Sequence, residues 1–198
     1  MKLVLKFGGT SLASPKDIIN VAKTIASFSK GNQIVVVCSA VDGVTDSLIL
    51  ISTMIEQRKK KEVADALDRL VKKHKKLADQ TIKNSVVKKQ LLEKLNADVS
   101  ELQELVRGLT LLKEVSARSL DYLISFGERL SDDLVSFALQ DLKKKSTALN
   151  GKEVGIVTDS NFGESRPLMD TTRIRISKTL GSLSVSYTHL TLPTILLV

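Results

Sequence analysis

The chain has 198 residues, 42% hydrophobic and 26% charged, which suits one sizeable globular domain. The most apolar helical stretch, Leu48–Ile55, is too short to span a bilayer, and the first residues do not resemble a secretory leader. Cys38 is the single cysteine, which excludes an internal disulfide and fits a reducing compartment. We therefore expect a cytoplasmic protein with no membrane partner.

The formal net charge of +8 is concentrated in short lysine runs. Runs of this kind can bind nucleic-acid phosphates, so a basic helical nucleic-acid-binding module is one hypothesis. Aromatic residues make up only 4% of the chain and none lies among the lysines, which leaves no platform for base stacking. We favour solvated helix faces and expect no nucleic-acid partner. The runs are Lys59–Lys61, Lys72–Lys76, Lys88–Lys89 and Lys143–Lys145.

The first 38 residues predict a βαβ unit. Lys2–Phe7 has the composition of a strand, and Ile34–Cys38 is a continuous apolar run, typical of a strand covered on both faces. Between them Ser14 is a capping residue, Pro15 suits the first helical position, and Gly31 ends the helix. Apolar residues at helical spacing give this helix one buried stripe: Ile18, Val21, Ala22 and Ile25.

The turn after the first strand reads KFGGTS, from Lys6 to Ser11. Glycines let backbone N–H groups approach an anion, and a helix N-terminus and a lysine add positive charge. The spacing differs from that of a P-loop, because the lysine precedes the glycines. The residues alone leave two readings open, a phosphate site or a tight strand–helix connection.

A second polar turn, Ser39–Asp46, follows the second strand. Parallel sheets bind ligands at the carboxyl ends of their strands, so this turn is expected to face KFGGTS. Its small hydroxyl residues suit a substrate carboxylate. The alternative is a polar helix entry capped by Thr45 or Asp46.

From Thr45 to about Gln140 the pattern is mostly helical, with a basic helical insertion at about residues 60–110. The insertion has the pattern of a lid, an interface or a scaffold, and the sequence does not choose among them. His74 falls on its apolar stripe, which favours packing. Neither His74 nor His189 has a motif linking it to Cys38, so we expect no metal site and no catalytic thiol.

Two further stretches carry candidate chemistry. SFGERLS, Ser125–Ser131, places Glu128 where a helix is expected to begin, either to hold an ammonium group or to form a surface pair with Arg129. Strands are expected at Ser146–Leu149 and Val154–Thr158, and Asp159 follows, either to orient the lysine or a metal or to cap its own turn. One α/β domain with a largely parallel sheet results.

Taken in order, KFGGTS, the VVVCSA–GVTD turn, SFGERLS and GIVTDSNFG resemble the aspartate kinases of the amino acid kinase family, from about Met1 to Leu183. The resemblance implies a three-layer α/β sandwich with a mostly parallel sheet and a helical insertion. It implies transfer of the ATP γ-phosphoryl group to the side-chain carboxylate of L-aspartate, with Mg²⁺, as the first step of lysine, threonine and methionine biosynthesis. A homo-oligomer is expected at full length.

The resemblance also implies roles for individual residues. Lys6 would stabilise the transferred phosphoryl group, and Asp159 would organise the site near the phosphates. Arg129 and Arg166 are the candidates for the arginine that binds the α-carboxylate of aspartate. The expected phosphate-binding residues are Lys6, Gly8, Gly9, Thr10 and Ser39, and the expected aspartate-binding residues are Thr45 and Glu128.

The chain departs from the family pattern near residue 183. A further glycine-rich nucleotide stretch and the regulatory domains are missing, and the helix expected over Arg173–Leu180 runs into VSYTHLTLPT, Val185–Thr194. These residues resemble a translated sequencing adapter, so we expect residues 184–198 to be a non-native tail; a genuine strand is the alternative. Residues 1–183 are then expected to be an inactive fragment of a longer kinase. Another amino acid kinase, or a kinase fused to homoserine dehydrogenase, is the alternative.

Overall fold

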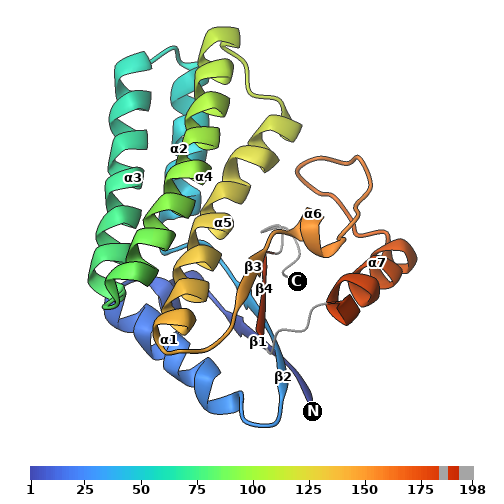
Figure 1. Ribbon diagram of the computed structural model, residues 1–198. Coiled ribbons are helices and arrows are strands. Elements are labelled where there is room, and N and C mark those ends of the chain that lie inside the picture. The colour runs from blue at the N-terminus through green and yellow to red at the C-terminus, as the bar shows by residue number, and fades with distance from the viewer. Residues whose placement is uncertain (183–186, 192–198) are drawn as a thin grey trace.

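The protein is described by a computed structural model, which places residues 1–182 and 187–191. Its centre is a four-stranded sheet in the order β1-β2-β4-β3, in which every pair of neighbouring strands is parallel (Figure 1). The prediction of a mostly parallel sheet is therefore confirmed. The strands are β1 (Lys2–Phe7), β2 (Gln33–Cys38), β3 (Thr147–Leu149) and β4 (Tyr187–Thr191).

The predicted βαβ unit is present. Helix α1 (Pro15–Phe28) joins β1 to β2, after a short 3₁₀ helix, η1 (Gly9–Leu12). The Ser14 side chain accepts a hydrogen bond from the Asp17 amide at 3.3 Å, which caps α1 as expected. Strands β1 and β2 pair along their whole length, so both polar turns emerge at the same edge of the sheet.

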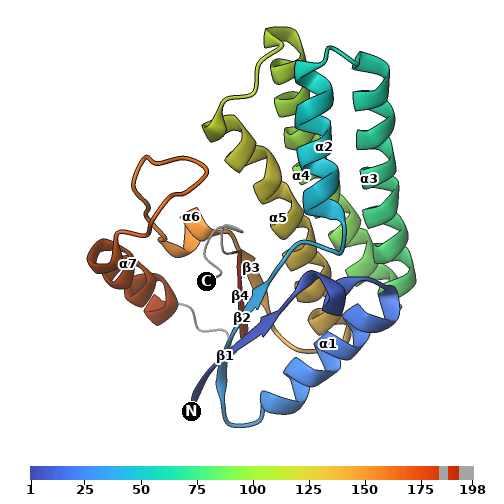
Figure 2. The same cartoon turned by 180° about the vertical axis from the view of Figure 1, so that it is seen from behind.

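Side-chain alternation along β2 builds the three layers. Ile34, Val36 and Cys38 face the large helical layer, whereas Val35 and Val37 face the opposite side. That opposite side is covered by α6 (Gly151–Val154) and α7 (Met169–Ser182) (Figures 1 and 2). The sheet thus lies between two helical layers, as the three-layer prediction requires.

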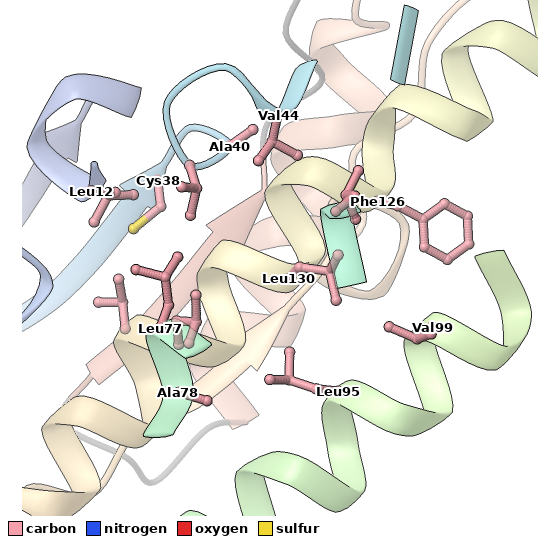
Figure 3. Close-up of a cluster of buried hydrophobic side chains, with 14 of the residues drawn as sticks. Leu12, Cys38, Ala40, Val44, Leu77, Ala78, Leu95, Val99, Phe126 and Leu130 are labelled. Atoms are coloured by element: carbon pink, nitrogen blue, oxygen red, sulfur yellow. The ribbon is translucent and has the colours of Figure 1, made fainter. Parts of the chain in front are cut away.

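The long helices α2 to α5 form the thicker of the two helical layers (Figure 2). Their buried side chains share one hydrophobic cluster with α1 and the sheet, in which Phe126, Leu130 and Leu95 are completely covered (Figure 3). Helix α5 contacts α1, α2, α3 and α4 and also the sheet, so it is the central element of the layer. The four helices are α2 (Val44–Glu56), α3 (Lys60–Thr81), α4 (Ser85–Leu112) and α5 (Ala117–Asp141).

The strand predicted over Val154–Thr158 is wrong. The Asn150 side chain accepts from the Glu153 amide, and the Glu153 carboxylate accepts from the Asn150 amide, which starts the short helix α6. Gly155 then ends this helix at φ 101°. Thr158 forms only an isolated antiparallel bridge with Pro167.

The helix expected over Arg173–Leu180 is confirmed within α7, which starts four residues earlier, at Met169. Of the tail 184–198, the structure describes residues 187–191, whose backbone forms β4 between β2 and β3. The alternative of a strand is therefore the conformation found for these five residues. The rest of the tail lies outside the described residues. No helix in the described ranges combines the length and hydropathy that a bilayer span needs.

Candidate functional site

Three of the four sequence motifs meet at one residue, Ala40. A Cβ atom on Gly9 would lie 2.9 Å from the Ala40 carbonyl oxygen, and a Cβ atom on Gly127 would lie 2.8 Å from Ala40 Cβ. The Ser131 hydroxyl donates to the Ser39 carbonyl at 2.7 Å. The β1 turn (residues 8–11), the β2 turn (residues 39–43) and the middle of α5 are thus packed together at the carboxyl edge of the sheet.

The glycines of the β1 turn have different environments. Gly9 needs to lack a side chain because it lies against the backbone of the β2 turn. Gly8 has open space around the position of a Cβ atom, and Thr10 is exposed. The backbone at Gly8 is therefore open to a ligand, whereas that at Gly9 forms one wall of the packed junction.

Lys6 lies on the other face of the sheet from Glu128. Its register partner is Val37, which packs toward α6 and α7, while the next pair, Phe7 and Cys38, packs into the helical layer. Lys6 is exposed, and it is the last residue of β1 on this face before the glycines. Its charge can reach a ligand lying over the carboxyl edge from the α6–α7 side.

The β2 turn leads directly into α2. Gly43 adopts φ 71° at the helix N-cap, and Thr45 is half-buried in the first helical turn, so neither Thr45 nor Asp46 is the capping residue. Ser39 is half-buried, and its amide donates to the Phe7 carbonyl at 3.0 Å. From the helical insertion, Lys73 Nζ donates to the Asp42 carbonyl at 2.5 Å. The insertion therefore contacts the β2 turn directly.

Glu128 is buried in the middle of α5, with 2% of its surface exposed. The expectation that it stands at a helix start is wrong, because α5 begins eleven residues earlier, at Ala117. The glycine that suggested a boundary, Gly127, serves the close contact with Ala40 instead. One helical turn further along α5, Asp132 is equally buried, and its charge and that of Glu128 act on each other.

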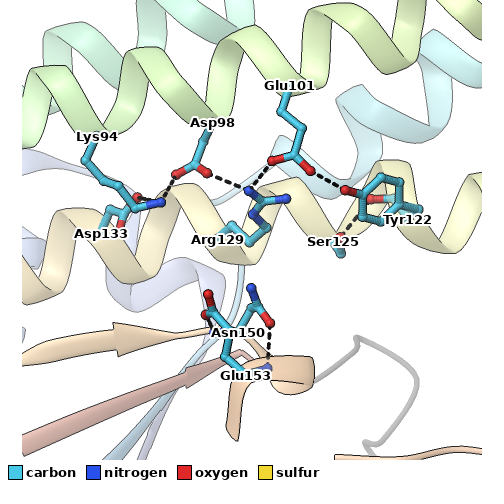
Figure 4. A network of polar contacts seen from close by, with 9 residues as sticks. All are labelled: Lys94, Asp98, Glu101, Tyr122, Ser125, Arg129, Asp133, Asn150 and Glu153. Atoms are coloured by element: carbon cyan, nitrogen blue, oxygen red, sulfur yellow. Dashed lines mark hydrogen bonds and ion pairs between the residues drawn. The ribbon is translucent and has the colours of Figure 1, made fainter. Parts of the chain in front are cut away.

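Arg129 connects α5 to α4. Its guanidinium donates to Asp98 and to Glu101, both at 2.6 Å (Figure 4). It also lies 4.4 Å from the centre of the Phe126 ring. The Arg129 hydrogen bond lowers the pKa of the Glu101 carboxyl, and Glu101 also accepts from the Tyr122 hydroxyl. These contacts favour a structural role for Arg129 over the binding of a substrate carboxylate.

Asp159 caps its own loop. Its Oδ1 accepts from the amides of Asn161 and Arg166, each at 3.1 Å. The loop lies against the start of α5, where the Gly163 amide donates to Asp121 Oδ2 at 2.8 Å. Within the described residues these contacts hold the loop against α5 and do not bring the fourth motif to the Ala40 junction, so the turn-capping alternative describes Asp159 here.

Cys38 and His74 are core residues. Burial raises the pKa of the Cys38 thiol well above its ordinary value, so the thiol stays protonated. Burial lowers the pKa of His74 to about 4, and His74 Nδ1 lies 2.9 Å from the Leu70 carbonyl oxygen. Among the residues that the structure describes, no group of three or more His, Cys, Asp or Glu is arranged to hold a metal ion.

Two residues of the junction were missed by sequence reasoning. Ala40 carries no chemistry, and its role depends on contacts with residues far away in the chain, so no local signal marked it. Asp132 did have a signal: it follows Glu128 by four residues within SFGERLSDD, which places both carboxyl groups on one helix face.

Residues 1–182 match the model of the amino acid kinase family. Aspartokinase 3, chloroplastic, of Arabidopsis thaliana is 30% identical over 179 residues, which cover 89% of this chain and 30% of the relative. Aspartokinase of Corynebacterium glutamicum is 27% identical, and the match covers 90% of this chain and 29% of that relative. This chain therefore spans about 30% of the length of these curated relatives.

Solved structures agree on the fold. E. coli aspartokinase III in complex with lysine and aspartate superimposes with a TM-score of 0.82 at 20% identity, covering 95% of this chain and 40% of that one. The same enzyme in complex with aspartate and ADP gives a TM-score of 0.75 at 21% identity, covering 96% of this chain and 40% of that one. Together with the family match over residues 1–182, this common fold establishes that the chain belongs to the amino acid kinase family.

Proposed function

We propose that this chain is the N-terminal part of an aspartate kinase catalytic domain. In the complete enzyme it would help to transfer the ATP γ-phosphoryl group to the side-chain carboxylate of L-aspartate, giving an acyl phosphate. The observation that carries the proposal is the junction at Ala40, where KFGGTS, the β2 turn and SFGERLS are packed together. The aspartokinase names of the curated relatives, and the aspartate and ADP of one solved relative, support this choice of substrate.

The two faces of the sheet suggest that phosphate and aspartate are bound from different sides. Lys6, on the α6–α7 face, would stabilise negative charge on the transferred phosphoryl group, and backbone amides at Gly8 and Gly9 would contact the phosphates. Thr10 and Ser39 lie in the two turns beside them. On the helical side, Thr45 and Glu128 would hold aspartate, with Glu128 receiving the substrate ammonium group. Asp159 would organise the phosphate side only after its loop moved.

Magnesium is proposed to enter with ATP. Mg²⁺ is commonly held by substrate phosphates together with one or two carboxylates, and it would neutralise charge on the phosphates. No residue of this chain is assigned to it.

The complete enzyme is proposed to be a cytoplasmic homo-oligomer, with the 198-residue chain inactive by itself. Fusion to a homoserine dehydrogenase stays an open alternative.

The proposal is tested by paired lysine variants in the complete enzyme. Lys6→Ala is expected to remove most of the turnover, whereas Lys2→Ala, on the same face at the other end of β1, is expected to leave it unchanged. Glu128→Gln is expected to raise the KM for aspartate more than that for ATP. Parental turnover in Lys6→Ala, or a Glu128→Gln effect confined to ATP, would overturn these assignments.

A further inference from the structure

Asp132 is a buried carboxyl group that no described residue neutralises. It is 2% exposed, and it lies on the face of α5 that points toward β2. The Cys38 thiol, which is a weak donor, faces it from β2 (Figure 3 shows Cys38), and no stronger donor within the described ranges reaches either carboxylate oxygen.

Among the described residues, the charged groups that act on Asp132 are acidic. They are Asp133, its neighbour in the chain, and Glu128, one helical turn before it. The nearby cations are engaged elsewhere: Lys94 lies 2.9 Å from Asp98 and 4.0 Å from Asp133, and Arg129 binds Asp98 and Glu101 (Figure 4).

A buried carboxylate without a cation is costly, and two neighbouring carboxyl groups do not both ionise easily. Burial raises the pKa of Asp132 well above its ordinary value, and the charges of Asp133 and Glu128 raise it further. Two carboxyl groups that interact in this way titrate as a pair and retain one proton at a pH where isolated carboxyl groups would both be ionised.

We propose that Asp132 is a positioning residue for Glu128: the two carboxyl groups hold one proton between them, and the proton on Asp132 leaves the negative charge on Glu128 for the ammonium group of the substrate amino acid. The inference rests on the proposed function, because it concerns the same ammonium site. It explains why an acidic side chain occupies a buried position that faces the core residue Cys38.

The kinetic test compares an amide with an apolar side chain at position 132 in the complete enzyme. Asp132→Asn keeps a neutral donor beside Glu128, so the KM for aspartate is expected to stay within about 2-fold of the parent. Asp132→Leu removes this donor and makes the surroundings of Glu128 more apolar, which disfavours the ionised form of Glu128, so the aspartate KM is expected to rise about 10-fold, equivalent to one pKa unit of lost ionisation. The ATP KM is expected to stay unchanged in both.

The pH profile separates this role from mere packing. In Asp132→Leu the aspartate KM is expected to fall again as the pH rises from 6 to 8 and Glu128 ionises. A parental aspartate KM in the leucine variant would overturn the proposal, because Asp132 would then be an ordinary core residue. An equal rise in both variants would also overturn it, because negative charge at position 132 would then be what matters.

A second measurement needs no substrate and uses the 198-residue chain. Asp132 keeps its proton in the folded chain but loses it in the unfolded chain once the pH exceeds the ordinary pKa of an aspartate. The free energy of unfolding therefore falls as the pH rises. The Tm of Asp132→Asn minus that of the parent is therefore expected to grow from pH 5 to pH 7, by roughly 2–5 °C per pH unit. A constant difference would overturn the shared proton. If the complete parental enzyme does not phosphorylate aspartate, the proposed function has failed. The Tm comparison would still show whether Asp132 holds a proton in the folded chain.

Discussion

Gly127 lies directly against Ala40, so that a Cβ atom on Gly127 would approach Ala40 Cβ to 2.8 Å. Gly127 is in the middle of α5, where no turn requires a glycine. The contact instead lets α5 approach the β2 turn, which brings Glu128 to the carboxyl edge of the sheet. A helix-weakening residue is thus retained because it allows two elements of the candidate site to touch.

Alanine at position 127 is expected to destabilise the protein, although it favours the helix. The added methyl group displaces the β2 turn or α5, and overpacking of this kind costs about 1–3 kcal/mol. Gly108→Ala is the matched control, because Gly108 is also inside a helix but has open space around its Cβ position. The control is expected to gain about 0.5–1 kcal/mol. Urea unfolding of both variants checks this, and equal shifts would refute the contact.

The helical insertion is expected to support the site through Lys73. Lys73→Met removes the hydrogen bond to the Asp42 carbonyl but keeps an apolar stem, so the β2 turn is less fixed. The aspartate KM of the complete enzyme is expected to rise about 2–10-fold, the usual range for one lost hydrogen bond. Lys72→Met is the control, since Lys72 pairs with Asp68 on the exposed face. If both variants behave alike, only the charge of α3 matters.

Stability is expected to depend on His74 under mildly acidic conditions. Burial lowers the pKa of His74 to about 4, below its ordinary value near 6.5, so the unfolded chain binds a proton that the folded chain rejects. The contribution is complete above pH 6.5 and is lost as the pH falls toward 4, by up to about 3 kcal/mol. In His74→Leu the difference in unfolding free energy between pH 7 and pH 4.5 is expected to shrink. An unchanged difference would show that other groups cause it.

Arg129 is expected to contribute to stability more than to substrate binding. Arg129→Met leaves Asp98, which is 3% exposed, without one of its cationic partners, and breaking such a buried pair costs about 3 kcal/mol. Lys89→Met is the control, because its pair with Glu93 is exposed on both sides and contributes little. Urea unfolding measures both. A large rise in aspartate KM with parental stability would instead assign Arg129 to the substrate carboxylate.

The βαβ unit could be predicted because its signals are local. Ser14 and Pro15 start α1, and the apolar run over Ile34–Cys38 is covered on both faces, as its composition indicates. The strand predicted over Val154–Thr158 failed because a capping box, from Asn150 to Glu153, outweighed β-branched composition. Capping depends on two residues three apart, which a scan for strand formers does not weigh.

The candidate site was predicted as a set of motifs but not as a junction. Glycines and hydroxyls identified the turns, yet the meeting of Gly9 and Gly127 at Ala40 depends on contacts across more than 30 residues. Gly127 also caused the wrong prediction that a helix begins near Glu128, because a glycine beside a charged residue resembles a helix boundary. The sequence allowed two roles for Asp159, and its hydrogen bonds to Asn161 and Arg166 favour the capping of its own turn.

We propose above that this chain contributes the aspartate side of a carboxylate kinase. The most direct measurement is ADP formation by the complete enzyme with L-aspartate, L-glutamate or UMP as the phosphoryl acceptor, with hydroxylamine present to trap any acyl phosphate. We expect ADP formation that depends on L-aspartate and yields the aspartyl hydroxamate. We also expect Glu128→Gln to weaken this activity at low aspartate concentration. ADP formation that instead follows L-glutamate or UMP would contradict the proposal.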